Sequence, residues 1–158
     1  MSQKLKVSFD DPEHGWVGLS LNYAQEAITI IASCILSDSF LDLTNVLHSL
    51  LFYQGETTVV WHEEPAETEL RFSNLEGLVR LEVYFFPDHR RNDKREEKGL
   101  AISGSYEEIC IPFWRALRSL QGRFSAEELD ARWQRPFPWK EIDLLTSAIT
   151  EKLSQAAR

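Results

Sequence analysis

The sequence is poor in cysteine, and this shortage already excludes some kinds of site. Its two cysteines, Cys34 and Cys110, each stand among apolar residues and do not form a CxxC pair. Such a pair is the usual sequence signal for a cysteine zinc site or a redox-active dithiol. We therefore expect two buried, reduced thiols that take no part in chemistry.

Positive charge is also scarce. The chain of 158 residues has 17 Lys and Arg against 25 Asp and Glu, which gives a formal net charge of −8. A surface of this sign repels phosphate backbones and anionic lipid headgroups. We therefore expect neither nucleic acid nor a membrane surface as the partner, and a basic protein fits this charge better.

Long apolar runs are missing as well. No stretch approaches the ~20 apolar residues that a membrane-spanning helix needs, and the N-terminus MSQKLKVSFDD lacks the apolar core of a signal peptide. These features predict a cytoplasmic protein. The hydrophobic content of 43% is enough for one sizeable core at this length, so we expect a single domain over residues 1–158.

Hydrophobic periodicity divides the chain into two parts. Apolar residues mostly recur at every second position over residues 4–104, which is typical of half-buried antiparallel strands. Helical spacing interrupts this part over residues 37–55 and returns after residue 104, where Pro112 indicates a kink or a late helix start. The pattern predicts an α+β fold. We expect a curved antiparallel sheet of about seven strands, with one inserted helix and a C-terminal helical third packed on it.

The sheet and the helices are expected to share one core. Its predicted members are apolar residues on the inward face of the sheet, of the inserted helix and of the C-terminal helices. They are Leu43, Leu47, Leu81, Val83, Phe113, Leu117 and Leu145.

The segment FDDPEHGWVGLSL (residues 9–21) gathers three carboxylates and His14 between two alternating apolar runs. Asp and Pro favour turns, because Asp bonds nearby backbone amides and Pro fixes φ. A metal site would need further ligands, for example His62 from the stretch VVWHEEPAE. However, HEEPA is not HExxH, because Ala66 stands in place of the second histidine and Pro65 would break the helix. We expect a strand-connecting turn and no metal.

Catalytic motifs are equally absent. The sequence contains no GxSxG, no phosphate-binding glycine loop and no GxGxxG. Adjacent carboxylates such as Glu63 and Glu64 would point to opposite faces of a strand, so they do not form an acid–base pair. We expect no catalytic residue, no cofactor and no enzymatic activity.

The segment FPDHRRNDKREEKG (residues 86–99) joins two predicted strands with almost no apolar residue. Its mixed charges predict a mobile, solvated hairpin loop. The functional alternative is a loop that docks on an acidic partner through Arg90, Arg91, Lys94 and Arg95. Interleaved acidic residues cancel most of the local potential, which argues against nucleic acid.

Aromatic residues are in surplus, because five tryptophans occur in this chain. Packing of the core and of the helices explains most of them. Trp16 and Trp61 lie on predicted strands beside His14 and His62, and would form a recognition surface if they lay on the sheet face away from the helices. The candidate binding residues are Trp16, Trp61, His62, Arg90 and Arg91.

The blocks FDDPEHGWVGLSL and FWRALRSLQGRFSAEELDARWQRPFP resemble stretches of small, uncharacterised bacterial α+β proteins. The acidic single-domain layout is similar to that of some toxin immunity proteins. The resemblance implies a cytoplasmic protein that blocks a basic toxin, such as a nuclease, by electrostatic and aromatic contact.

Three classes of function follow. A protein-binding or inhibitor module is favoured, because negative charge, spare aromatic residues and the missing catalytic signature coincide. The second class is a self-associating protein, a homodimer that pairs through an open sheet edge or the aromatic helices. The third is an enzyme or small-ligand binder whose site the sequence does not reveal.

Overall fold

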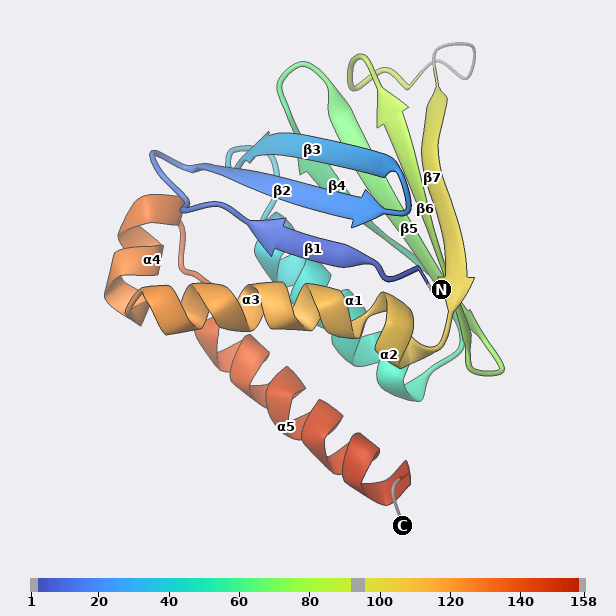
Figure 1. Cartoon of the computed structure of the whole chain (residues 1–158). Helices are drawn as coiled ribbons and strands as arrows, with labels where there is room; N and C mark the ends of the chain where they lie inside the picture. Colours follow the sequence, from blue (N-terminus) through green and yellow to red (C-terminus); the bar gives the residue numbers. More distant parts are fainter. Residues whose placement is uncertain (1–2, 92–95, 157–158) are drawn as a thin grey trace.

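The strands precede most of the helices, as the periodicity predicts. A computed structural model describes residues 3–91 and 96–156, and its seven strands form one antiparallel sheet in chain order (Figure 1). The strands are β1 (Lys6–Phe9), β2 (Trp16–Tyr23), β3 (Glu26–Ser33), β4 (Gly55–His62), β5 (Glu67–Leu75), β6 (Leu78–Phe86) and β7 (Glu97–Gly104). The predicted α+β fold is therefore confirmed.

The helices lie between β3 and β4 and after β7. Helix α1 (Ser39–Phe52) lies between β3 and β4, and the Asp38 side chain accepts a hydrogen bond from the Leu41 backbone at its start. After β7 come α2 (Tyr106–Ile109), α3 (Ile111–Arg123), α4 (Ala126–Trp133) and α5 (Trp139–Ala156). Pro112 lies in the first turn of α3, where its missing N–H costs nothing, so the predicted late helix start is confirmed. None of the helices in residues 3–91 and 96–156 is long and apolar enough to cross a membrane.

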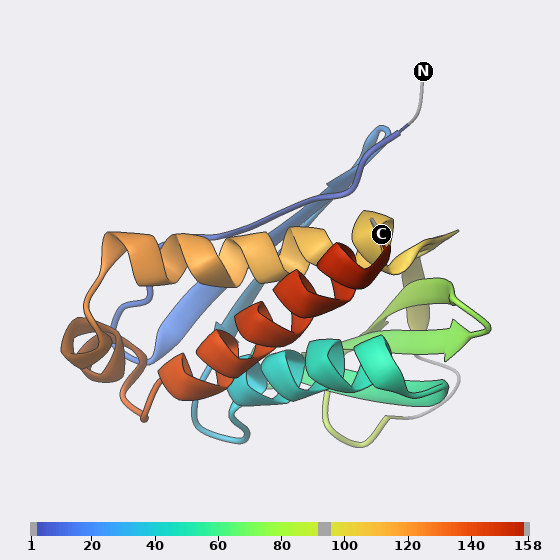
Figure 2. The same cartoon turned by 90° about the horizontal axis from the view of Figure 1, so that it is seen from below.

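The sheet bends sharply at its centre. Strands β3 and β4 are paired only where Ser33 lies opposite His62, so β1–β3 and β4–β7 diverge as two halves. The start of β3 lies close to β7. Ile28 of β3 approaches Gly99 of β7 so closely that a Cβ built on Gly99 would lie 3.4 Å from Ile28 Cδ1. Helices α1 and α3 cover the inner face of this curved sheet, and α5 packs across α1 and α3 (Figure 2). No helix from the described residues lies on the opposite, outer face.

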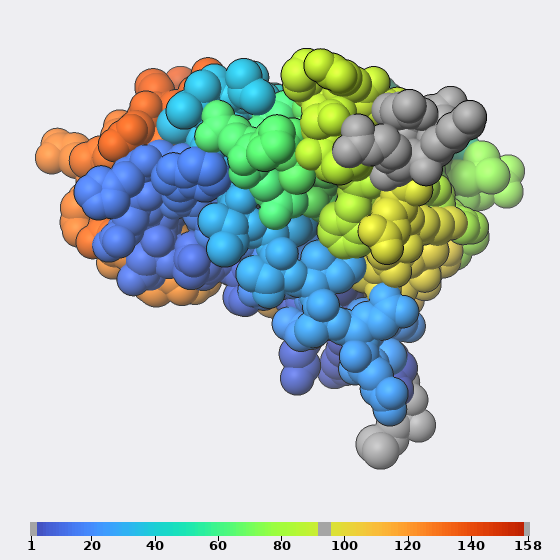
Figure 3. Space-filling view, turned by 90° about the horizontal axis from the view of Figure 1, so that it is seen from above, coloured from blue at the N-terminus to red at the C-terminus, as the bar shows by residue number. Residues whose placement is uncertain are grey.

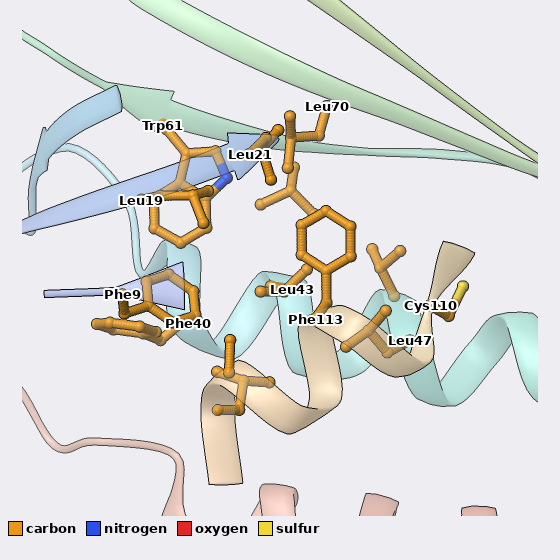
Figure 4. Close-up of a cluster of buried hydrophobic side chains, with 14 of the residues drawn as sticks. Phe9, Leu19, Leu21, Phe40, Leu43, Leu47, Trp61, Leu70, Cys110 and Phe113 are labelled. Carbon is orange, nitrogen blue, oxygen red and sulfur yellow. The ribbon is translucent and has the colours of Figure 1, made fainter. Parts of the chain in front are cut away.

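The core lies between the inner sheet face and the helices (Figure 4). All of the core residues predicted from the sequence are fully buried there. Both cysteines are buried and free, and burial raises the pKa of the Cys110 thiol far above its usual range. Three of the tryptophans pack in or against the core from the helical third, namely Trp114, Trp133 and Trp139.

Candidate interaction surface

A row of paired residues crosses the outer face of the sheet at one end of its strands. The register places Trp16 opposite Ser33, Ser33 opposite His62, His62 opposite Glu67 and Glu67 opposite Phe86. Residues directly opposite each other point to the same face, so all five side chains lie on the outer face. Figure 3 shows the molecule from the side of this face. The row brings together Trp16 and His62, two residues that the sequence singled out.

Trp61 does not belong to this surface. Because it precedes His62 on β4, its side chain points to the inner face, where it is fully buried. Its ring centroid lies 5.9 Å from those of both Phe9 and Phe40 (Figure 4). The prediction that Trp61 is a surface contact is therefore wrong, whereas Trp16 is 36% exposed.

The connection between β1 and β2 holds Trp16 in place. Glu13 and Trp16 exchange two backbone hydrogen bonds of 2.9 Å, and the Asp10 carboxylate accepts one of 2.7 Å from the Gly18 backbone. The backbone has positive φ at His14 (53°) and Gly15 (79°). The predicted strand-connecting turn is confirmed. Within the part of the chain that the structure describes, no three His, Cys, Asp or Glu side chains are grouped to hold a metal ion.

Gly15 fastens this turn to two distant segments. Its N–H donates to the Arg132 carbonyl at the end of α4, and its carbonyl accepts from the Cys34 N–H, both at 2.9 Å. A Cβ at this position would lie 2.9 Å from Cys34 Sγ, so the close approach requires glycine. Arg135 donates a further hydrogen bond of 2.8 Å to the Cys34 carbonyl. The turn, the end of β3 and the end of α4 therefore form one assembled edge.

Negative charge collects along this edge. We define the acidic edge as residues 10–15, 34–38, 63–66 and α4, together with Arg123 and Arg135, which bond to it. It contains nine carboxylates and three arginines, so it holds most of the net charge of −8. The carboxylates are Asp10, Asp11, Glu13, Asp38, Glu63, Glu64, Glu127, Glu128 and Asp130. Because they come from four separate segments, the sequence shows no continuous acidic patch.

An apolar patch lies within the acidic edge. Ile31 lies diagonally across the β2–β3 pair from Trp16, because Gly18 is the residue directly opposite Ile31. Ile35 and Leu36 follow β3 in the adjoining segment, and the Ile35 N–H lies 3.4 Å from Ser33 Oγ. All four apolar side chains are exposed. We call these four residues the Trp16 patch. Its aliphatic members are not among the candidates that the sequence indicates, although Ile31 occupies an outward position in the alternating run EAITIIAS.

Beyond His62 the outer face carries a network of ion pairs. Glu67 and Glu69 are buried although they point outward. Arg91 bridges them, since its Nε lies 2.8 Å from Glu67 Oε2 and its Nη1 lies 2.5 Å from Glu69 Oε1. Arg71 bonds Glu69 as well and also lies 2.9 Å from Glu96 Oε1. This network anchors the start of the β6–β7 connection on the sheet.

The network changes the interpretation of the loop arginines. Arg91 faces the sheet and pairs with two carboxylates, so it is not free to dock on an acidic partner. Arg90 is exposed, and its backbone N–H donates to Asp88 Oδ1 at 3.0 Å. Lys94 and Arg95 lie outside the described residues.

His62 connects the Trp16 patch with this network. Its Nδ1 lies 3.5 Å from Glu67 Oε1, and it is buried without a hydrogen-bond partner among the described residues. The side chain is only 14% exposed. His62 therefore supports the centre of the row and offers little surface for contact.

Two carboxylates of the outer face are held in their charged form. Burial would raise the pKa of Glu69, but hydrogen bonds from Arg71 and Arg91 outweigh burial and leave the pKa below its usual range. For Glu82, hydrogen bonds from Lys98 (2.8 Å) and Tyr84 (2.7 Å) lower the pKa to about 2. The open face of β5–β7 is thus a set of neutralised pairs and supplies no free acid or base.

We expect the protein to lose stability as the pH falls from about 4.5 toward 2, the range between the ordinary pKa of Glu82 and its value in the folded chain. A carboxyl group whose pKa is lower in the folded state stabilises the fold above its unfolded pKa, and that contribution disappears as protons bind. Urea unfolding at several pH values measures the loss. A Glu82→Gln variant should lose less stability over this range, and an equal loss in both proteins would contradict the assignment.

Comparison with protein-family models, curated protein sequences and solved structures finds no match to this chain. The geometry of the described residues is therefore the basis for a functional inference. It offers an exposed tryptophan in an apolar patch, a surrounding excess of carboxylates and a paired antiparallel sheet beneath Trp16 and Ile31.

Proposed function

We propose that this chain is a protein-binding module of the inhibitor or immunity type, which holds a basic partner through the Trp16 patch. The observation that carries the proposal is the exposed apolar group of Trp16, Ile31, Ile35 and Leu36 inside the acidic edge. Protein interfaces commonly combine an apolar centre, often with an aromatic anchor, and a polar rim.

Charge and apolar contact have separate roles in this proposal. The carboxylates of the acidic edge attract a cationic surface over a distance, so they raise the association rate and make it sensitive to salt. The exposed part of the Trp16 ring leaves water only in the complex, so its contact slows dissociation. Trp16 and Ile31 stand on paired antiparallel strands, which keep this half of the patch preformed and lower the ordering cost of binding.

The expected effect of Trp16→Ala is a loss of affinity of about 30-fold or more, corresponding to the ~2 kcal/mol of an interface anchor. The partner is first captured from a cell extract of the native host and identified, and its binding to the purified variants is then measured at two salt concentrations. Leu144→Ala is the matched control, because Leu144 is an exposed apolar residue on α5, outside the patch.

Two results would contradict the proposal. The first is that no protein is retained above background by the wild-type chain. The second is that a retained protein binds Trp16→Ala and Leu144→Ala equally well, which would place the contact elsewhere. A binding rate that does not change with salt would separately exclude the role given to the acidic edge.

A further inference from the structure

The end of β5 and β6 that lies away from the acidic edge forms an apolar projection. Glu76 and Gly77 make the turn between the two strands, both with positive φ (52° and 86°), as a two-residue hairpin turn requires. Leu75 and Leu78 flank the turn and are 68% and 57% exposed. We call residues 75–78 the leucine knob. Figure 1 shows it projecting past α1 and α2 at the lower right.

A groove lies beside the leucine knob. It has a volume of about 520 Å³, and its apolar lining comes from the end of α1, from α2 and from the end of α5. These lining residues are Leu50, Leu51, Tyr106 and Leu153. Lys152 also borders the groove, with its ammonium 5.5 Å from the centre of the exposed Phe52 ring. Gly77 borders the groove as well, so knob and groove are neighbours on one end of the molecule.

We propose that a second copy of this chain docks here, with the leucine knob of each copy in the groove of the other. In a dimer with a two-fold axis, both copies use the same surface. Because the leucine knob and the groove lie side by side, the knob of each copy can enter the groove of the other in a single interface. The exposed leucines would then be removed from water in apolar surroundings.

Charge complementarity favours this occupant. Glu76 lies at the tip of the knob. Lys152 lies at the border of the groove, which Glu107 also lines. Neither Glu76 nor Lys152 has an ion-pair partner within the described residues, so each is available to the opposite charge of the second copy. The two-fold axis forms this pair twice, Glu76 of one copy with Lys152 of the other, and the reverse.

The distribution of charge points to the same end of the molecule. The acidic edge begins beside Glu67 at the start of β5, whereas the knob lies at the end of that strand. Two copies that met at their acidic edges would repel each other. Docking through the knob holds the acidic edges apart and leaves both Trp16 patches free. The inference does not depend on the proposed function of that patch.

The experiment uses the full chain in sedimentation velocity over a concentration series. We expect a monomer–dimer equilibrium in the wild type. In a dimer of Glu76→Lys, both contacts between positions 76 and 152 join two lysines. In a dimer of Lys152→Glu, both contacts join two glutamates. Each substitution should therefore weaken the dimer at least tenfold. A mixture of the two variants should recover the dimer, because a heterodimer has an opposite-charge pair at both positions.

The mixture separates contact between copies from any effect within one copy. Thermal unfolding should show that both variants remain folded, since both residues are exposed. A second pair of substitutions, Leu75→Ser with Leu78→Ser, should abolish the dimer. A wild type that stays monomeric up to ~100 μM would overturn the proposal. So would a mixture no more dimeric than the separate variants, or a dimer that survives loss of both leucines.

Discussion

Phe40→Ala is expected to lower the free energy of unfolding by about 3–5 kcal/mol, the range for truncation of a buried phenylalanine. Phe40 is fully buried at the start of α1. Its ring centroid lies 5.0 Å from that of Phe9, 4.7 Å from that of Trp133 and 5.1 Å from that of Phe137. One side chain thus joins the sheet, α1, α4 and the segment before α5, and alanine would leave a cavity among rings that cannot close over it.

Chemical denaturation followed by tryptophan fluorescence measures this change. The matched control is Phe52→Ala, which truncates the same residue type on the same helix at a position that is mostly exposed. It should cost less than about 1 kcal/mol. Because Phe40 connects the sheet and the helices, both variants should unfold in a single transition. Two separate transitions would show that sheet and helices are independent domains, and equal losses would refute the packing described for Phe40.

The sequence predicts the fold well because each element carries its own local signal. Period-two runs predict the strands, and helical spacing predicts the inserted helix and the helical third, which the structure confirms. Pro112 marks the start of α3 for a local reason as well, since proline is tolerated only in a first turn. Such signals depend on a few neighbouring residues and require no knowledge of tertiary contacts.

The candidate surface depends on which face each residue occupies, and there sequence reasoning is weaker. Trp61 and His62 are adjacent on a strand, so one side chain must face the core and the other the outer face. Each of the two rings has both apolar and polar atoms, so residue type alone does not identify Trp61 as the buried one. Alternation along β4 would have settled it, because Val59 shares a face with Trp61. The neighbourhood of Trp16 and Ile31 likewise follows only from the register of β2 and β3.

Contacts between distant segments are invisible in a single sequence. The acidic edge is assembled because Gly15 contacts both Cys34 and Arg132, residues from three separate parts of the chain. The contacts of Arg91 are also between distant segments, whereas the mixed charges of its own loop predict that its side chain lies in solvent. Its two partners lie 24 and 22 residues away on β5. An arginine in a polar loop gives no local sign that two buried carboxylates require it.

Arg91→Met is therefore expected to destabilise the protein at neutral pH by about 3 kcal/mol, at the lower end of the range for a broken buried ion pair. Methionine keeps much of the apolar volume that packs on the Phe86 ring, where the guanidinium carbon now lies 4.4 Å from the ring centre. The change mainly removes the charge that Glu67 and Glu69 share. These two buried carboxylates would then face each other's charge with less compensation.

Equilibrium unfolding at pH 7 and at pH 4 tests this expectation, with Arg90→Met as the matched control. Arg90 is the exposed neighbour in the same loop, so its substitution should change stability by less than about 0.5 kcal/mol. The deficit of Arg91→Met should shrink at pH 4, because protons then neutralise carboxylates that have lost their cation. Adding Glu67→Gln to Arg91→Met should recover part of the loss at pH 7, since one uncompensated charge is gone. If Arg90→Met and Arg91→Met were equally harmless, the bridge between Glu67 and Glu69 would contribute nothing to the fold, and the loop would be as solvated as its composition suggests.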